Sequence, residues 1–191
     1  MDYKKDIQNY LDEEINILKK IDVSMVDAAI HLLEETRKKN GKVYVFGNGG
    51  SSATASHFQN DFNKGVSERI IQKYRFICLN DNVATLMAIA NDNGFENVFF
   101  QQLEDKLEKN DICIAISGSG NSENVIKAVE YAKNVGNRVI GLTGYKGGML
   151  RELADVSLHV PIDNMQITED VHLIYNHMMM YILFNKLIGK E

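Results

Sequence analysis

Short apolar runs and amphipathic segments alternate along the chain from Lys42 onward. A short apolar run is typical of a buried strand, and apolar positions at helical spacing are typical of an amphipathic helix. Their alternation predicts an α/β fold with a mostly parallel sheet covered by helices on both faces. The predicted strands cover residues 42–46, 75–79, 111–116, 138–142 and 156–160. The predicted helices between and after them cover residues 52–63, 85–90, 97–107, 122–135 and 167–188, the last being a long C-terminal helix.

Two further amphipathic helices are predicted ahead of the first strand, over residues 2–21 and 24–39. They lie outside the strand–helix alternation, so their apolar stripes either pack against a partner subunit or cover one face of the sheet. The chain has one proline and no low-complexity linker, which predicts a single domain over residues 1–191. The apolar stripes of the two N-terminal helices predict that residues 1–40 lie at an oligomer interface. The apolar stripe of the first helix consists of Ile7, Leu11, Ile15 and Leu18.

Two Ser/Gly loops each follow a predicted strand and open a predicted helix. The first is Gly47–Ser52 and the second is Ser117–Ser122. Backbone N–H groups at the start of a helix lie at the positive end of its dipole and bind phosphate. Two such loops at the carboxyl ends of parallel strands, with hydroxyls added, predict a site for a phosphorylated small molecule. The predicted phosphate- and substrate-binding residues of the loops are Asn48, Gly49, Gly50, Ser51, Ser117, Gly118, Ser119, Asn121 and Ser122.

Two other phosphate-binding folds fit these loops less well. A dinucleotide-binding fingerprint needs a third glycine where the chain has Ser52, and it needs an acidic residue at the next strand end, where Asp81 comes too late. A P-loop needs Gly-Lys-Ser/Thr, which neither loop contains. Hydroxyl groups suit one terminal phosphate because they donate hydrogen bonds without adding charge. A sugar-phosphate site is therefore favoured.

The composition limits the classes of partner. The formal net charge of -5 gives no basic footprint for nucleic acid. No apolar stretch approaches the length of a membrane span, and the N-terminus lacks an apolar signal core. We therefore expect no nucleic-acid or membrane partner, a cytoplasmic location, and reduced, buried thiols at Cys78 and Cys113.

Two pairs of side chains with helical spacing are candidates for chemistry. His57 and Asp61 are four residues apart on the helix that the first loop opens, so they share one face. Glu169 and His177 are eight residues apart on the C-terminal helix. Two turns of a helix take about 7.2 residues, so these two side chains lie roughly on the same face. Two imidazoles and two carboxylates make a reasonable tetrahedral zinc site, although iron or manganese also fit such ligands.

Several motifs together resemble the SIS (sugar isomerase) family. They are Phe46–Ser51, Ile116–Ser122 and Gly141–Gly144, and the residues His57, Ala90–Phe95 and Glu169 to His177 are similar to the phosphoheptose isomerase branch. The resemblance implies a flavodoxin-like fold, a homotetramer with sites at subunit interfaces, and bound zinc. It also implies conversion of sedoheptulose 7-phosphate to D-glycero-D-manno-heptose 7-phosphate, which would feed nucleotide-activated heptose for surface polysaccharide.

The resemblance also implies roles for individual residues. Asp61 would remove the carbon proton and His177 would be the opposite acid/base, while His57, Asp61, Glu169 and His177 would hold the metal. Glu169 would also contact the substrate. Asp92 would bind a substrate hydroxyl, although it could equally cap the start of a helix.

Four positions depart from the family pattern: Asp61 replaces a glutamate, Glu169 a glutamine, Ile167 an arginine and Gly118 a threonine. These departures keep two alternatives open. One is a non-catalytic SIS-domain protein that binds a sugar phosphate or has a regulatory role, and the other is an isomerase of another phosphosugar.

Overall fold

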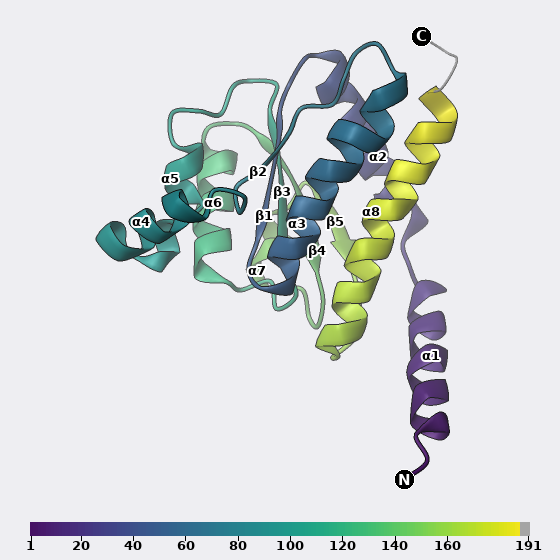
Figure 1. The fold of residues 1–191 in the computed structure, drawn as a ribbon. Coiled ribbons are helices and arrows are strands. Elements are labelled where there is room, and N and C mark those ends of the chain that lie inside the picture. Colours follow the sequence, from purple (N-terminus) through teal and green to yellow (C-terminus); the bar gives the residue numbers. More distant parts are fainter. Residues whose placement is uncertain (188–191) are drawn as a thin grey trace.

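A parallel β-sheet forms the centre of the computed structural model, which describes residues 1–187 (Figure 1). Within these residues the sheet has the strand order β2-β1-β3-β4-β5, and every neighbouring pair is parallel. This is the order of flavodoxin-like folds. The predicted fold class is therefore confirmed. The strands are β1 (Val43–Gly47), β2 (Phe76–Cys78), β3 (Ile112–Ser117), β4 (Arg138–Thr143) and β5 (Val156–His159).

Helices cover both faces of the sheet. Successive side chains of a strand point to opposite faces, so Val43 and Val45 join a core under α2, α3 and α8, whereas Tyr44 and Phe46 join a core under α5, α6 and α7. Burial on both faces explains why the strands read as continuous apolar runs. The helices are α1 (Lys4–Leu18), α2 (Val23–Lys38), α3 (Gly50–Asn60), α4 (Val83–Asn93), α5 (Phe100–Leu103), α6 (Glu123–Asn134), α7 (Gly148–Leu153) and α8 (Met165–Leu187).

The predicted helix over residues 97–107 is wrong. The segment forms a 3-10 turn at Phe95–Asn97 and the single turn of α5, and Asp105 then takes a left-handed conformation with φ 56°. The helix predicted over residues 85–90 is the longer α4, and α7 lies where no helix was predicted. The predicted end of the C-terminal helix at residue 188 lies outside the described residues.

The helix after the first loop changes its pitch at Asp61. α3 ends at Asn60, a π-helical turn covers Asp61–Val66, and a 3-10 turn covers Ser67–Arg69. π-helical turns inside a helix are rare and are frequent at functional sites. The wider turn changes the direction in which Asp61 and the following side chains point, relative to a continuous α-helix.

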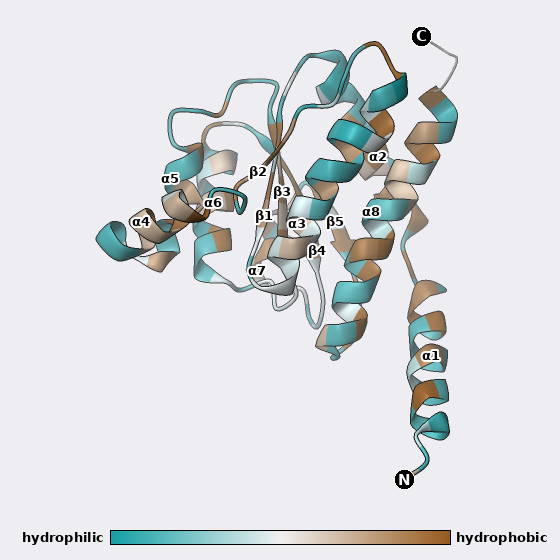
Figure 2. Ribbon diagram, viewed as in Figure 1, coloured by the Kyte–Doolittle hydropathy of each residue, from teal (hydrophilic) through white to brown (hydrophobic). Residues whose placement is uncertain are grey.

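The first helix extends away from the sheet, whereas α2 packs on it. Figure 1 shows α1 beyond the start of α8, and Figure 2 shows apolar and polar residues alternating along it. Ile7, Leu11 and Ile15 are exposed, and Ile17 is the residue of α1 that is buried. The apolar stripe of α1 therefore does not cover the sheet within one chain. Among residues 1–187, no helix combines the length and apolar character needed to cross a membrane.

Candidate functional site

The first Ser/Gly loop is held at the carboxyl end of β1. Asn80 donates from Nδ2 to the carbonyl of Gly47 at 2.9 Å and accepts from the Gly47 N–H at 3.3 Å. Gly49 has φ 55°, a conformation that glycine adopts readily, and Gly50 then begins α3. The turn leaves the N-terminus of α3 directed out of the strand end, with Ser51 in its first turn.

The second loop gathers three hydroxyl groups. Ser117 Oγ lies 3.1 Å from Ser122 Oγ and 3.5 Å from Ser119 Oγ. The backbone N–H of Gly120 donates to Ser117 Oγ at 3.2 Å, which orients this hydroxyl. Convergent hydroxyls beside the N-terminus of α6 can donate hydrogen bonds to one anion, as predicted for a terminal phosphate.

An amide pair joins the two loops. Asn48 Nδ2 donates to Asn124 Oδ1 at 2.8 Å, and Asn124 Nδ2 donates to Asn48 Oδ1 at 2.9 Å. Sequence reasoning missed Asn124, which is buried on α6; a polar residue on the apolar side of that helix was the available signal. Both polar atoms of the Asn48 side chain are engaged in this pair, so Asn48 orients the loops.

Helices α3 and α8 lie side by side and run in the same direction (Figure 1). Contacts mark their register: a Cβ atom on Gly50 would meet Glu169, and one on Gly65 would meet Met180. His57 lies about two turns after Gly50 and His177 about two turns after Glu169, so the two histidines face each other. Their rings form an edge-to-face pair with centroids 4.9 Å apart.

His57, Asp61 and His177 form a cluster that could hold a metal ion. The two Nε2 atoms are 3.1 Å apart, and Asp61 Oδ2 lies 3.3 Å from His57 Nε2 and 3.6 Å from His177 Nε2. Zinc bonds of about 2.1 Å place tetrahedral ligand atoms about 3.4 Å apart. The donor set and its spacing therefore fit zinc, with three protein ligands and a fourth position for water or substrate.

The structure does not bring Glu169, the predicted fourth ligand, into this cluster. The register of α8 on α3 places its carboxylate beside Gly50, where a Cβ atom would lie 2.3 Å from Oε2. Glu169 therefore lies at the first loop, two turns before His177, and the helix N-terminus there favours its negative charge.

Asp61 has a buried partner that sequence reasoning missed. Asn176 Nδ2 donates to Asp61 Oδ2 at 2.7 Å, and both side chains are buried. Asn60 Nδ2 makes a longer bond of 3.3 Å to Asp61 Oδ1. The signal for Asn176 was its place beside His177 on the inner side of α8.

Two departures from the family pattern have structural counterparts. Ile167 is fully buried in the apolar core, so its side chain offers no exposed surface to a ligand. A Cβ atom at Gly118 would lie 3.0 Å from Met165 Sδ. Met165 therefore packs against the place that a threonine side chain at residue 118 would need.

Asp92 and His172 have different surroundings. Asp92 lies in the last turn of α4 and accepts from Asn91 Nδ2 at 2.7 Å, so it does not cap the start of a helix. Figure 1 places α4 on the opposite side of the sheet from α8. His172 is buried inside the chain, and burial lowers its pKa to about 4, while the Thr143 backbone opposes the shift.

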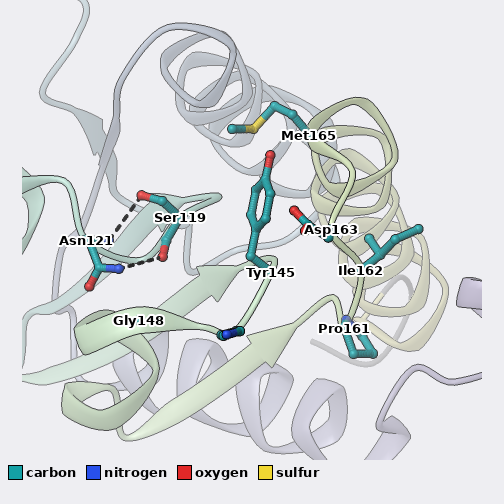
Figure 3. Close-up of a pocket in the computed structure, with 9 residues that line it drawn as sticks. Ser119, Asn121, Tyr145, Gly148, Pro161, Ile162, Asp163 and Met165 are labelled. Carbon is teal, nitrogen blue, oxygen red and sulfur yellow. Dashed lines mark hydrogen bonds between the residues drawn. The ribbon is translucent and has the colours of Figure 1, made fainter.

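A cavity of about 590 Å³ lies beside the second loop. Figure 3 shows Tyr145 standing between Ser119 and Asn121 on one side and the Pro161–Met165 segment on the other. Tyr145 has φ 48°, which is uncommon for a bulky residue. The cavity leaves open space next to Ser119, at the edge of the hydroxyl cluster.

Comparisons with known proteins point to one family over most of the chain. The family model described as SIS domain matches residues 5–144. The phosphoheptose isomerase of Helicobacter pylori (strain P12) is 38% identical over 162 residues, covering 81% of this chain and 80% of that protein. The phosphoheptose isomerase of Aliarcobacter butzleri is 36% identical over 184 residues, covering 95% and 96%. The structure of phosphoheptose isomerase GmhA from Neisseria gonorrhoeae superposes with a TM-score of 0.88 at 30% identity, covering 96% of this chain and all of that one.

Proposed function

The chain belongs to the SIS domain family, and we propose that it is a ketose–aldose isomerase that converts sedoheptulose 7-phosphate to D-glycero-D-manno-heptose 7-phosphate. Relatives that match nearly its full length at 30% identity or more include phosphoheptose isomerases. The observation that carries the proposal is the cluster of His57, Asp61 and His177 beside two hydroxyl-bearing loops.

The loops would hold the phosphate end of the sugar. Ser117, Ser119 and Ser122 donate from one cluster, and Ser51 with the N-terminus of α3 donates from the other side. Ser51 and His57 are six positions apart on α3, which corresponds to a rise of about 9 Å. An open-chain sugar phosphate anchored at the loops can therefore extend along α3 toward the cluster.

The cluster would act at the other end of the sugar. His57, Asp61 and His177 would hold a zinc ion, which when bound polarises the oxygens on C1 and C2. Asp61 Oδ2 faces the imidazoles, so the second oxygen of this carboxylate is assigned to remove and return the carbon proton. His177 Nε2 faces the metal cluster, so the half-exposed His177 is assigned to exchange protons with the sugar oxygens through its other ring nitrogen, Nδ1.

A homotetramer whose sites lie at subunit interfaces belongs to the same proposal. It is supported by the exposed apolar stripe of α1 and by the half-exposed side chains of His57 and His177, which a second subunit can cover. In such an assembly Asp92, on the far side of its own sheet, would contact the substrate of a neighbouring copy. The buried, unpaired thiols of Cys78 and Cys113 favour a reducing cytoplasmic location.

Turnover of sedoheptulose 7-phosphate tests the proposal. The wild type, with verified zinc content, is compared with Asp61→Ala and His177→Gln, which should lose at least about 100-fold in kcat/KM because each removes an acid/base group. His31→Gln is the matched control, since His31 is an exposed histidine on α2 paired with Asp27. An inactive zinc-loaded wild type would refute the isomerase assignment.

A further inference from the structure

Asn176 is a buried amide with one hydrogen bond at the cluster. Its side chain is fully buried on α8, and its Nδ2 donates to Asp61 Oδ2 at 2.7 Å. Its Oδ1 has no hydrogen-bond partner within residues 1–187. A buried polar atom without a partner is unfavourable, so an apolar side chain of similar volume would suit the core better. The contribution of this amide to the site therefore comes through Asp61.

The direction of the bond is fixed by charge. An ionised carboxylate only accepts hydrogen bonds, and an asparagine amide offers a donor at one end and an acceptor at the other. The reversed amide would place Asn176 Oδ1 against Asp61 Oδ2, with two acceptors in contact. The bond is therefore a charge-assisted one from Asn176 to Asp61, a class stronger than bonds between neutral groups.

Asp61 needs such a partner because several groups share its Oδ2 atom. His57 Nε2 and His177 Nε2 both lie within 3.6 Å of this oxygen. The χ2 torsion of aspartate is broad and has weak preferences, so the π-helical turn that starts at Asp61 does not by itself orient the carboxylate. The Asn176 bond selects the rotation in which Oδ2 faces the two imidazoles.

We infer that Asn176 is a positioning residue that orients Asp61 for a divalent cation held with His57 and His177. This inference rests on the proposed function, because it concerns the same cluster. Partners that hydrogen-bond to metal ligands fix ligand orientation, and their loss typically lowers metal affinity or activity by about 10–100-fold.

Direct zinc binding, measured by competition with a chelating dye, tests the inference without an activity assay. Asn176→Leu and Asn176→Val both remove the donor and differ in volume. Met179→Leu is the matched control, because Met179 is a fully buried neighbour on α8 that lies outside the cluster. The thermal unfolding midpoint of each zinc-free protein is measured alongside.

Both Asn176 variants should bind zinc about 10–100-fold more weakly than the wild type, whereas Met179→Leu should bind it as the wild type does. The zinc-free unfolding midpoints of the two Asn176 variants should differ from each other, because both lose the bond to Asp61 but their side chains differ in volume, whereas their zinc affinities should fall alike. Wild-type zinc affinity in either variant would overturn the inference, as would a loss that follows the unfolding midpoint across all three variants, or a wild type that binds no zinc. A wild type that binds zinc with this dependence on Asn176 but does not isomerise would contradict the proposed function alone.

Discussion

The Glu169 carboxylate lies over Gly50, so closely that a Cβ atom at Gly50 would be 2.3 Å from Oε2. This contact places a negative charge at the N-terminus of α3, where we propose that the first loop binds the phosphate of the ligand. The helix N-terminus favours the carboxylate, and the carboxylate in turn opposes a second anion nearby. Glu169 therefore lies at the end of the site where we propose that the phosphate binds.

Glu169→Gln should strengthen phosphate binding and leave zinc binding unchanged. The substitution keeps the side-chain shape and removes a charge that repels an anion, an effect of about 1 kcal/mol or about fivefold at a partly exposed site. Calorimetry with inorganic phosphate and a zinc competition assay measure the two affinities. A tenfold loss of zinc affinity, at about 1.4 kcal/mol, would instead identify Glu169 as the fourth metal ligand.

Ser117→Ala should weaken binding of the sugar phosphate. Ser117 Oγ lies at the centre of the hydroxyl cluster, and a hydrogen bond to a charged group contributes about 1.5–3 kcal/mol. KM should rise by about 10–100-fold, with little change in zinc affinity. Ser157→Ala is the matched control, because the buried Ser157 Oγ has no partner within residues 1–187 and lies on β5. Equal effects of both substitutions would mean that Ser117 does not contact the phosphate.

The free energy of unfolding should decrease as the pH is lowered, in a window set by His172. Burial holds its folded-state pKa at about 4, below the ordinary 6.5. The unfolded chain therefore gains a proton as the pH falls through 6.5, and the folded chain gains it only near 4. The stability is fully present above pH 6.5 and is lost between pH 6.5 and pH 4, by about 3 kcal/mol.

Urea unfolding at pH 7.5 and pH 4.5 measures this loss. His172→Gln should lose less free energy of unfolding than the wild type between the two pH values, because the variant has no imidazole to protonate. Other titrating groups are shared by the two proteins and cancel in the comparison. An identical pH dependence in both proteins would show that His172 is not the group responsible.

The sheet and the two loops could be predicted because their signals are local. The strands are continuous apolar runs, and each loop lies between such a run and a helix. Asn124 and Asn176 could not be found in this way, since their partners Asn48 and Asp61 are 76 and 115 residues away in sequence. Spacing along α8 alone put Glu169 and His177 on one face. The parallel packing of α8 on α3 gave them different neighbours, Gly50 and His57.

Asp61 stands where the family pattern has a glutamate, and this difference bears on whether the chain catalyses isomerisation of its ligand. Asp61 is shorter than glutamate, and its position is set by the π-helical turn and by Asn176. A catalytic group misplaced by about 1 Å can cost about 100-fold in rate. The local pitch of the helix and the buried amide together provide a way for this chain to position the shorter carboxylate.

Exchange of the carbon-bound proton tests the central claim most directly. Zinc-loaded protein is incubated with sedoheptulose 7-phosphate in deuterated water, and deuterium at C1 and C2 is followed by NMR. We predict that the wild type incorporates deuterium as it forms the aldose, and that Asp61→Asn does so at least about 100-fold more slowly. Tight binding of the sugar phosphate without any exchange would contradict the account and would identify a sugar-phosphate-binding protein that performs no isomerisation.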